Sequence, residues 1–289
     1  GSGEALLPAA ARRFTAEPSS FKAQELGNLA WAFALLGPDE LEAFHCIGSA
    51  ALLRMAEFKP QELSNLLWSF AGAAVPCPTL VGCASEEVRC RIEQFEHQDL
   101  SNTAWALATL AVRDDLLLHL ISQEAVAKLD HFSPQSTANL AWALAARGVP
   151  CRGFLRGVAA AVRGRRWDFR AQEVASLAWS FATLAADPEA FQELAAGAIP
   201  RIEDFKPQEL SNMAWSHARL TLRRPALFRA MVPQALAKLR SCTPQHLVIL
   251  IWSFAQVHAV ELQLFKSIEA EIVERFRSVA DGRRKTLPK

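Results

Sequence analysis

The chain has 289 residues, of which 51% are hydrophobic and 21% are charged, and its formal net charge at pH 7 is +1. This balance excludes a protein that binds nucleic acid through bulk positive charge. No uncharged apolar run approaches the roughly 18 residues of a membrane-spanning helix, so we expect no membrane insertion. The chain opens Gly1-Ser2-Gly3 without a methionine, so any targeting peptide is expected to lie outside this sequence.

The chain is dominated by a segment that occurs seven times. Its tryptophans are spaced by 37 residues, with one step of 36, and a glutamine precedes each by seven positions. Such a period is typical of helical repeat arrays. We therefore predict an all-α, right-handed superhelical α-solenoid of seven helix-pair repeats over residues 21–280. The repeat tryptophans are Trp31, Trp68, Trp105, Trp142, Trp179, Trp215 and Trp252.

The residues on either side of the array receive separate interpretations. In the first segment, Ala11-Arg12-Arg13-Phe14 resembles Ala51-Leu52-Leu53-Arg54-Met55 at the end of a repeat. Residues 1–20 are therefore interpreted as the remnant of a preceding repeat or as an N-terminal extension. Residues 281–289 are interpreted as a basic, flexible tail.

Each repeat is expected to form two helices. Proline at the expected first helical position of several units suits a helix start, where a missing N–H costs nothing. Ser133 and Thr243 precede two of these prolines as candidate N-caps. The first helices are expected to end near Gly37, Val75, Val112, Gly148, Ala186, Leu222 and His258. The rest of each unit is then available for a second helix.

The first helix of the second unit illustrates the expected packing. At about 100° per residue, Leu63, Leu66 and Phe70 share a wide apolar arc, whereas Gln61, Asn65 and Trp68 share a separate stripe. Four residues before most repeat tryptophans stands a small residue, which would let the neighbouring helix approach closely. We therefore expect the tryptophans to be buried between units. The small residues are Gly27, Ser64, Ser101, Ala138, Ala175 and Ser211.

These residues resemble the octotricopeptide repeat and its 37-residue heptatricopeptide relatives. The matching positions are Pro60, Glu62, Leu63, Asn65, Trp68 and Ala71, and again Pro207, Glu209, Leu210, Asn212, Trp215 and Ala218. The resemblance implies an α-solenoid that binds RNA in an organelle, either a plastid or a mitochondrion. Solenoids with the same core can instead bind protein. The chain lacks the nuclease-like module that some relatives carry after their repeats.

The first candidate RNA-binding set is a basic residue near the end of each second helix. We name these residues the basic ladder, because stacked units would align them so that they could follow a phosphate backbone. The alternative is that they neutralise helix C-termini or form ion pairs. The basic ladder comprises Arg54, Arg91, Lys128, Arg165, Arg201, Lys238 and Arg275.

The second candidate set lies in the unit at 132–168. Arg152, Arg156 and Arg163 share one helical stripe, and Trp167 follows Arg165 near the helix end. Arginines beside an exposed aromatic residue suit single-stranded RNA, whose bases can stack. The units at 132–168 and 205–241 have a surplus of positive charge, so RNA contact is expected to centre on them. The alternative is that Trp167 packs under the turn between repeats.

The last candidate position lies four residues after each repeat tryptophan, where the residue varies. Arg219 occupies it in the sixth unit. If the array has a sequence code, this position could carry it, by analogy with readers of one base per repeat. The glutamines and asparagines recur almost unchanged and so cannot distinguish bases. We expect them to form ladders that satisfy neighbouring amides.

No catalytic motif or cofactor-binding pattern is present, so we expect neither an enzyme nor a cofactor. The favoured function is binding of single-stranded RNA in an organelle, in RNA maturation, stability or translation. The alternative is a scaffold subunit that binds proteins within a large organelle assembly. Near-neutral charge favours the scaffold, whereas the basic ladder and the family resemblance favour RNA.

Overall fold

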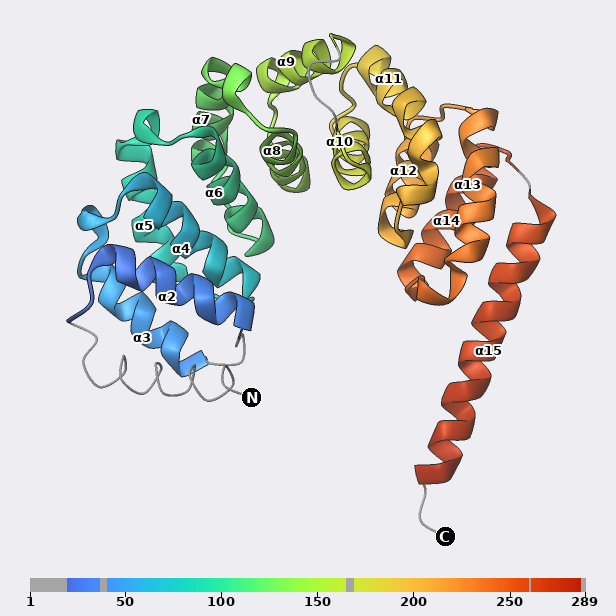
Figure 1. Cartoon of the computed structure of the whole chain (residues 1–289), viewed down its shortest axis with the longest axis horizontal. Coiled ribbons are helices and arrows are strands. Elements are labelled where there is room, and N and C mark those ends of the chain that lie inside the picture. Colours follow the sequence, from blue (N-terminus) through green and yellow to red (C-terminus); the bar gives the residue numbers. More distant parts are fainter. Residues whose placement is uncertain (1–19, 37–40, 165–168, 260, 287–289) are drawn as a thin grey trace. The chain divides into compact units, whose positions relative to one another are not determined.

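The structure is a computed structural model that describes residues 20–36, 41–164, 169–259 and 261–286. All regular structure in these ranges is helical, and it comprises fourteen α-helices joined by turns and short 3-10 helices. The helices form seven pairs, as the sequence period predicts, so the prediction of an all-α solenoid is confirmed (Figure 1). The chain divides into two compact units, which we call unit 1 (Gly1–Val158) and unit 2 (Ala159–Lys289), with the boundary inside helix α9.

Unit 1 contains four helix pairs. The first helices pack one against the next, and the second helices pack beside them in a separate layer (Figure 1). The first helices are α2 (Ala23–Leu36), α4 (Pro60–Gly72), α6 (His97–Thr109) and α8 (Pro134–Arg147). The second helices are α3 (Leu41–Leu52), α5 (Pro78–Cys90), α7 (Asp115–Ala127) and α9 (Arg152–Arg163), of which the last crosses the boundary.

Unit 2 repeats this arrangement with three further pairs. Its first helices are α10 (Ala171–Thr183), α12 (Pro207–Arg219) and α14 (Pro244–Gln256). Its second helices are α11 (Pro188–Ala198), α13 (Pro225–Ala237) and α15 (Leu262–Thr286). Helix α12 packs against both α10 and α14, and α13 lies against α11 and α15. Residues 1–19 of the predicted N-terminal segment and 287–289 of the predicted tail lie outside the described residues, whereas α15 continues through residue 286.

Small residues allow the first helices to approach closely. All six small residues before the tryptophans are buried, which confirms the prediction for this position. A Cβ atom added to Gly27 would lie 3.4 Å from the backbone carbonyl oxygen of Glu62 on the next helix. The equivalent Ser64 hydroxyl instead donates a hydrogen bond to the Asp99 carboxylate at 3.1 Å. Larger side chains here would push the backbones apart.

The helix ends follow local rules that the sequence partly reveals. Ser133 and Thr243 accept hydrogen bonds from the N–H groups three residues on, so both predicted N-caps are confirmed. The described first helices from α4 onward end one or two residues before a residue in the left-handed conformation. Only one of these six is a glycine, Gly148, and Ala111 with φ of 55° is a typical alternative. This reversal ends most first helices slightly earlier than predicted.

Candidate functional site

The basic ladder bonds to backbone rather than standing free. Lys128 lies at the end of α7, and its Nζ donates to the carbonyl oxygens of Glu93 and Phe95, each at 2.7 Å. The same ammonium pairs with the carboxylate of Glu124 at 3.1 Å, and its side chain is only 20% exposed. Phe95 opens the repeat that Lys128 closes, so this bond ties the two ends of one repeat together.

The same bond recurs along both units. In unit 1, Arg91 donates to the carbonyl oxygen of Phe58 at 3.0 Å. In unit 2, Arg201 donates to that of Phe169 at 2.8 Å, and Lys238 donates to that of Phe205 at 2.8 Å. The acceptor is in every case the backbone carbonyl of the residue that begins the repeat. This residue precedes the first helix, so its carbonyl oxygen needs a hydrogen-bond donor from outside that helix.

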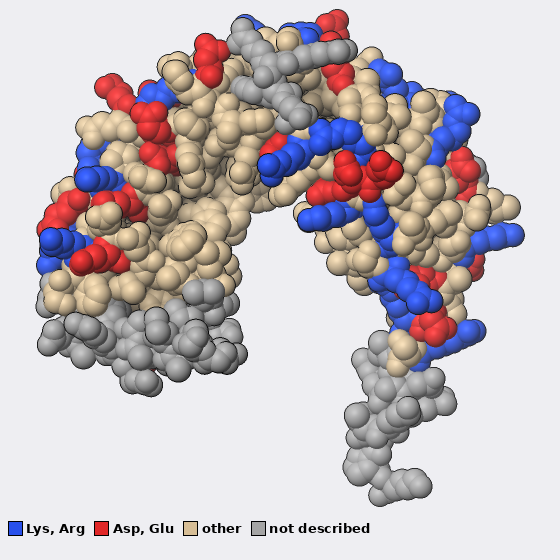
Figure 2. All heavy atoms as spheres, in the orientation of Figure 1, with Lys and Arg blue, Asp and Glu red and all other residues tan. Residues whose placement is uncertain are grey.

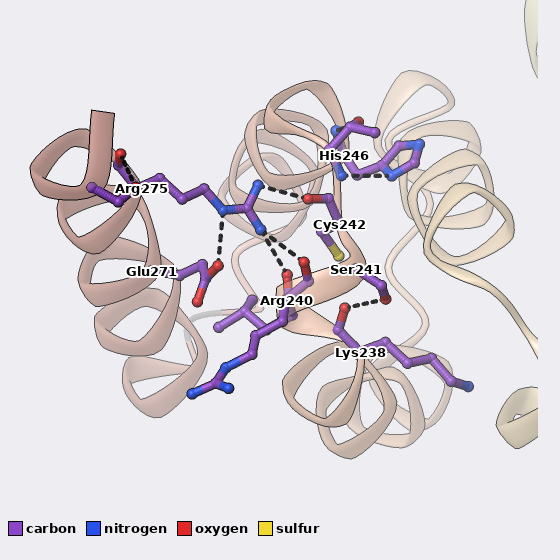
Figure 3. Close-up of polar contacts among 10 residues, drawn as sticks. Lys238, Arg240, Ser241, Cys242, His246, Glu271 and Arg275 are labelled. Atoms are coloured by element: carbon purple, nitrogen blue, oxygen red, sulfur yellow. Dashed lines mark hydrogen bonds and ion pairs between the residues drawn. The ribbon is translucent and has the colours of Figure 1, made fainter. Parts of the chain in front are cut away.

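Figure 3 shows this contact at the last repeat. Arg275 extends from α15 toward the turn before α14, where its Nη1 donates to the Cys242 carbonyl oxygen at 2.7 Å. Its Nη2 donates to the carbonyl oxygens of Leu239 and Arg240, each at 3.2 Å. The Glu271 carboxylate pairs with Nε at 2.8 Å. One guanidinium therefore donates hydrogen bonds to three carbonyl groups and one carboxylate.

The remaining ladder positions differ. Arg54 pairs with Glu57, three residues on, at 3.2 Å. Arg165 lies outside the described residues, as does Trp167 from the second candidate set. The structure therefore gives a local stabilising contact to every ladder residue that it describes, and RNA contact by these residues stays a prediction.

The three arginines of α9 are not equivalent. Arg152 and Arg156 are exposed in the second-helix layer. Arg163 pairs with Asp187, the N-cap of α11, at 2.9 Å. Backbone hydrogen bonding from Ala190 and the Arg163 guanidinium lower the pKa of the Asp187 carboxyl below its ordinary value. Arg163 thus has a structural contact that its two neighbours along the helix lack.

Within each of the two units, neighbouring first helices display a polar and aromatic stripe, and we call this surface the amide–aromatic stripe. Each repeat contributes the glutamine seven residues before its tryptophan, the residue three before it, the tryptophan itself and the residue four after it. The five inner tryptophans are half-buried, and those of the first and last repeats are exposed, Trp31 at 50% and Trp252 at 43%. The prediction that they are buried between units is therefore wrong. The periodic position of the indole lies at the edge of the core arc, because smaller residues already fill the space between helices.

Neighbouring indoles contact one another along the stripe. In unit 1, the rings of Trp68 and Trp105 stack with centroids 5.9 Å apart and planes 29° apart. In unit 2, Trp179 and Trp215 stack at 6.1 Å and 30°. Offset stacking of this kind stabilises aromatic pairs, and it leaves ring surface available at the outer face.

The amides beside these rings are available for ligands. All seven glutamines are exposed, and the asparagines are exposed or half-buried. Within the described ranges, none of these side-chain amides makes a hydrogen bond to another protein group, so the predicted amide ladders do not form. A polar residue that recurs in every repeat and has no partner within the protein is a sequence signal of a ligand-binding surface, and periodicity alone does not reveal whether it has such a partner. The stripe glutamines are Gln24, Gln61, Gln98, Gln135, Gln172, Gln208 and Gln245.

The variable position also faces outward. Of its seven members, Thr183 is half-buried and the others are exposed, including Arg219. Arg219 therefore lies on the same stripe as Gln208 and Trp215, whereas Arg152 and Arg156 lie in the other layer. Figure 2 shows basic and acidic side chains interspersed over the visible face of each unit. The stripe consequently offers amides, rings and few charges.

In the ranges given above, no group of three His, Cys, Asp or Glu residues is placed to hold a metal ion. None of the described helices is long and apolar enough to cross a lipid bilayer.

Comparison with known proteins identifies the family. Residues 9–187 match the family described as RNA-editing substrate-binding complex 6 protein. No curated protein matches the chain. The matched range covers more than half of the 289 residues and five of the seven repeat tryptophans. The chain therefore belongs to the family of RNA-editing substrate-binding complex 6 proteins.

Proposed function

We propose that this protein binds single-stranded RNA along the amide–aromatic stripe. The observation that carries the proposal is a row of unpaired side-chain amides beside stacked, partly exposed indoles. Indole faces accept unstacked bases, and amides offer both a donor and an acceptor to base edges. In a base-paired RNA helix the base faces are stacked and the base edges are paired, so the stripe suits single-stranded RNA.

Phosphate contacts are secondary in this proposal. Most described ladder cations already donate to backbone carbonyls, so their nitrogen atoms have fewer hydrogens to offer a phosphate. Arg219 lies on the stripe, and Arg152 and Arg156 are exposed elsewhere. These arginines are the better candidates for phosphate contact.

The family supports a role in an RNA-containing assembly. Its description names an RNA-editing substrate-binding complex, and we propose that this chain is a non-catalytic, cofactor-free component of such a complex. The resemblance to octotricopeptide and heptatricopeptide repeats supports the same class of partner. It also supports an organelle location, a mitochondrion or a plastid, and a role in RNA maturation, stability or translation.

A direct comparison of strands tests the proposal. The whole protein is titrated into a labelled single-stranded 20-mer RNA and into the same RNA annealed to its complement, both at physiological salt. The single strand should bind at least about tenfold more tightly, since base stacking on aromatic side chains contributes about 1–3 kcal/mol per base. Equal affinity for the two forms, or no binding of the single strand, would overturn the proposal.

A protein scaffold is the second candidate, and one surface favours it. On α14, Val248, Ile251, Trp252 and Ala255 follow the spacing of an apolar helix face, and Val248 is 62% exposed. Val248 replaces the small residue that is buried at this position in the first six repeats. On α2 the next first helix, α4, covers this position at Gly27, so the fitting occupant on α14 is an apolar helix of a partner protein. If the protein is a scaffold that does not bind RNA, the single-stranded 20-mer should not bind.

A further inference from the structure

A small polar groove lies on the stripe of unit 2, between α10 and α12. Its volume is about 190 Å³, and Ala175 is one of its lining residues. The other lining residues are polar or charged, and they come from the two neighbouring repeats. They are Gln172, Ser176, Lys206, Gln208, Glu209 and Asn212.

The groove coincides with a change in the repeat pattern. Ser176 stands three residues before Trp179, where five other repeats have an asparagine. A serine side chain has a hydroxyl group where an asparagine side chain has the larger carboxamide group. The missing amide therefore leaves room between Gln172 on one helix and Asn212 on the next.

The lining groups have hydrogen-bonding capacity to spare. The amides of Gln172, Gln208 and Asn212 make no hydrogen bond to other protein groups in the part of the chain that the structure describes. Each amide can donate two hydrogen bonds and accept others. Gln172 and Gln208 are exposed and Asn212 is half-buried, so a ligand in the groove can reach all three.

The charged residues indicate which ligand fits. Glu209 is 8% exposed, and its carboxylate accepts a hydrogen bond from the Lys206 backbone N–H at 2.6 Å. A carboxylate accepts only, so this side of the groove suits a ligand edge that donates, such as an exocyclic amino group. The exposed Lys206 side chain provides a cation for an attached phosphate.

The neighbouring indoles extend the site. Trp179 follows Ser176 by three residues, and Trp215 follows Asn212 by three, so both rings lie one turn along the same stripe. Their stacked rings are 6.1 Å apart. A nucleotide adjacent to the one in the groove can therefore stack on aromatic surface.

We propose that this groove holds one base of the bound strand, and that it selects a base with an exocyclic amino group. The inference rests on the proposed RNA function and gives it a defined nucleotide site. The base edge pairs with the amides of Gln172, Gln208 and Asn212 and with the Glu209 carboxylate. Its phosphate lies toward Lys206.

Filling the groove tests the proposal. Ser176→Asn restores the side chain that five other repeats accept, so the variant should keep the melting temperature of the wild type. Ser49→Asn is the matched control, because it makes the same change at an exposed serine of α3, outside the stripe. Single-stranded RNA should bind at least about fivefold more weakly to Ser176→Asn, and Ser49→Asn should not weaken binding. If Ser176→Asn binds RNA as the wild type does, the groove is not the site.

Mononucleotides separate this inference from the proposed function. In ligand-observed NMR, AMP and CMP should contact the wild type and lose that contact in Ser176→Asn. UMP, which lacks an amino group, and ribose 5-phosphate, which lacks a base, should contact it less. Equal contact by ribose 5-phosphate would overturn base recognition. Should AMP behave as expected while the RNA strand fails to bind, the groove stands and the proposed function falls.

Discussion

At the scale of single residues, the core of unit 2 contains a histidine at a position that is otherwise apolar. His217 stands two residues after its tryptophan, where four other repeats have a phenylalanine. Its ring packs between Phe191 and Phe228, with centroids 4.7 and 6.0 Å away, and it is fully buried. Burial lowers the pKa of His217 to about 4, with a smaller contribution from the charge of Arg224.

The shift predicts a dependence of stability on pH. The unfolded histidine takes up a proton below about pH 6.5, whereas the folded one does so only near pH 4. The free energy of unfolding should therefore fall as pH decreases from 6.5 to 4, by roughly 3 kcal/mol from this group. Urea titrations of the wild type and of His217→Phe measure the effect. Identical pH dependence in the two proteins would show that the histidine is not buried as a neutral ring.

At the scale of the repeat element, the ladder bonds hold the turn between repeats against the preceding turn. Lys128→Met removes the donor to the carbonyls of Glu93 and Phe95, and it should lower the free energy of unfolding by about 1–3 kcal/mol. Lys128→Arg is the control, because arginine makes the same bond at Arg91. Urea unfolding provides the measurement. Unchanged stability in Lys128→Met, together with a shallower salt dependence of RNA binding, would instead assign this residue to phosphate contact.

The same scale shows what sequence can predict here. The helix pairs, the apolar arc around Leu63 and the N-cap at Ser133 follow from local spacing, and all are confirmed. The role of the basic ladder depends on carbonyls about 33 residues away, so local periodicity leaves capping and phosphate binding equally open. The outward position of the indoles was missed because a large aromatic residue at regular spacing is typical of a core.

The candidate site was predicted only in part. The spacing placed Gln61, Asn65 and Trp68 on one stripe, and it placed the variable residue beside them, as the structure has them. Whether the amides bond to one another depends on side-chain geometry between repeats, which spacing does not determine. The groove at Ser176 likewise depends on the neighbouring helix. These are the features on which the proposed function depends.

At the scale of the whole molecule, we expect the affinity for RNA to depend on the unpaired amides of the stripe. The full chain and the variant Gln61→Ala/Gln98→Ala/Gln135→Ala are compared for affinity toward a single-stranded RNA. These side chains are exposed, and their amides make no hydrogen bond to another described protein group, so the fold should persist. Gln94→Ala/Gln263→Ala removes exposed glutamines outside the stripe as a control.

Equilibrium binding measured by fluorescence anisotropy gives the decisive result. Each lost hydrogen bond is worth about 0.5–1.5 kcal/mol, so the triple variant should bind at least about tenfold more weakly than the full chain and the control. An affinity of the triple variant equal to that of the full chain would contradict this expectation.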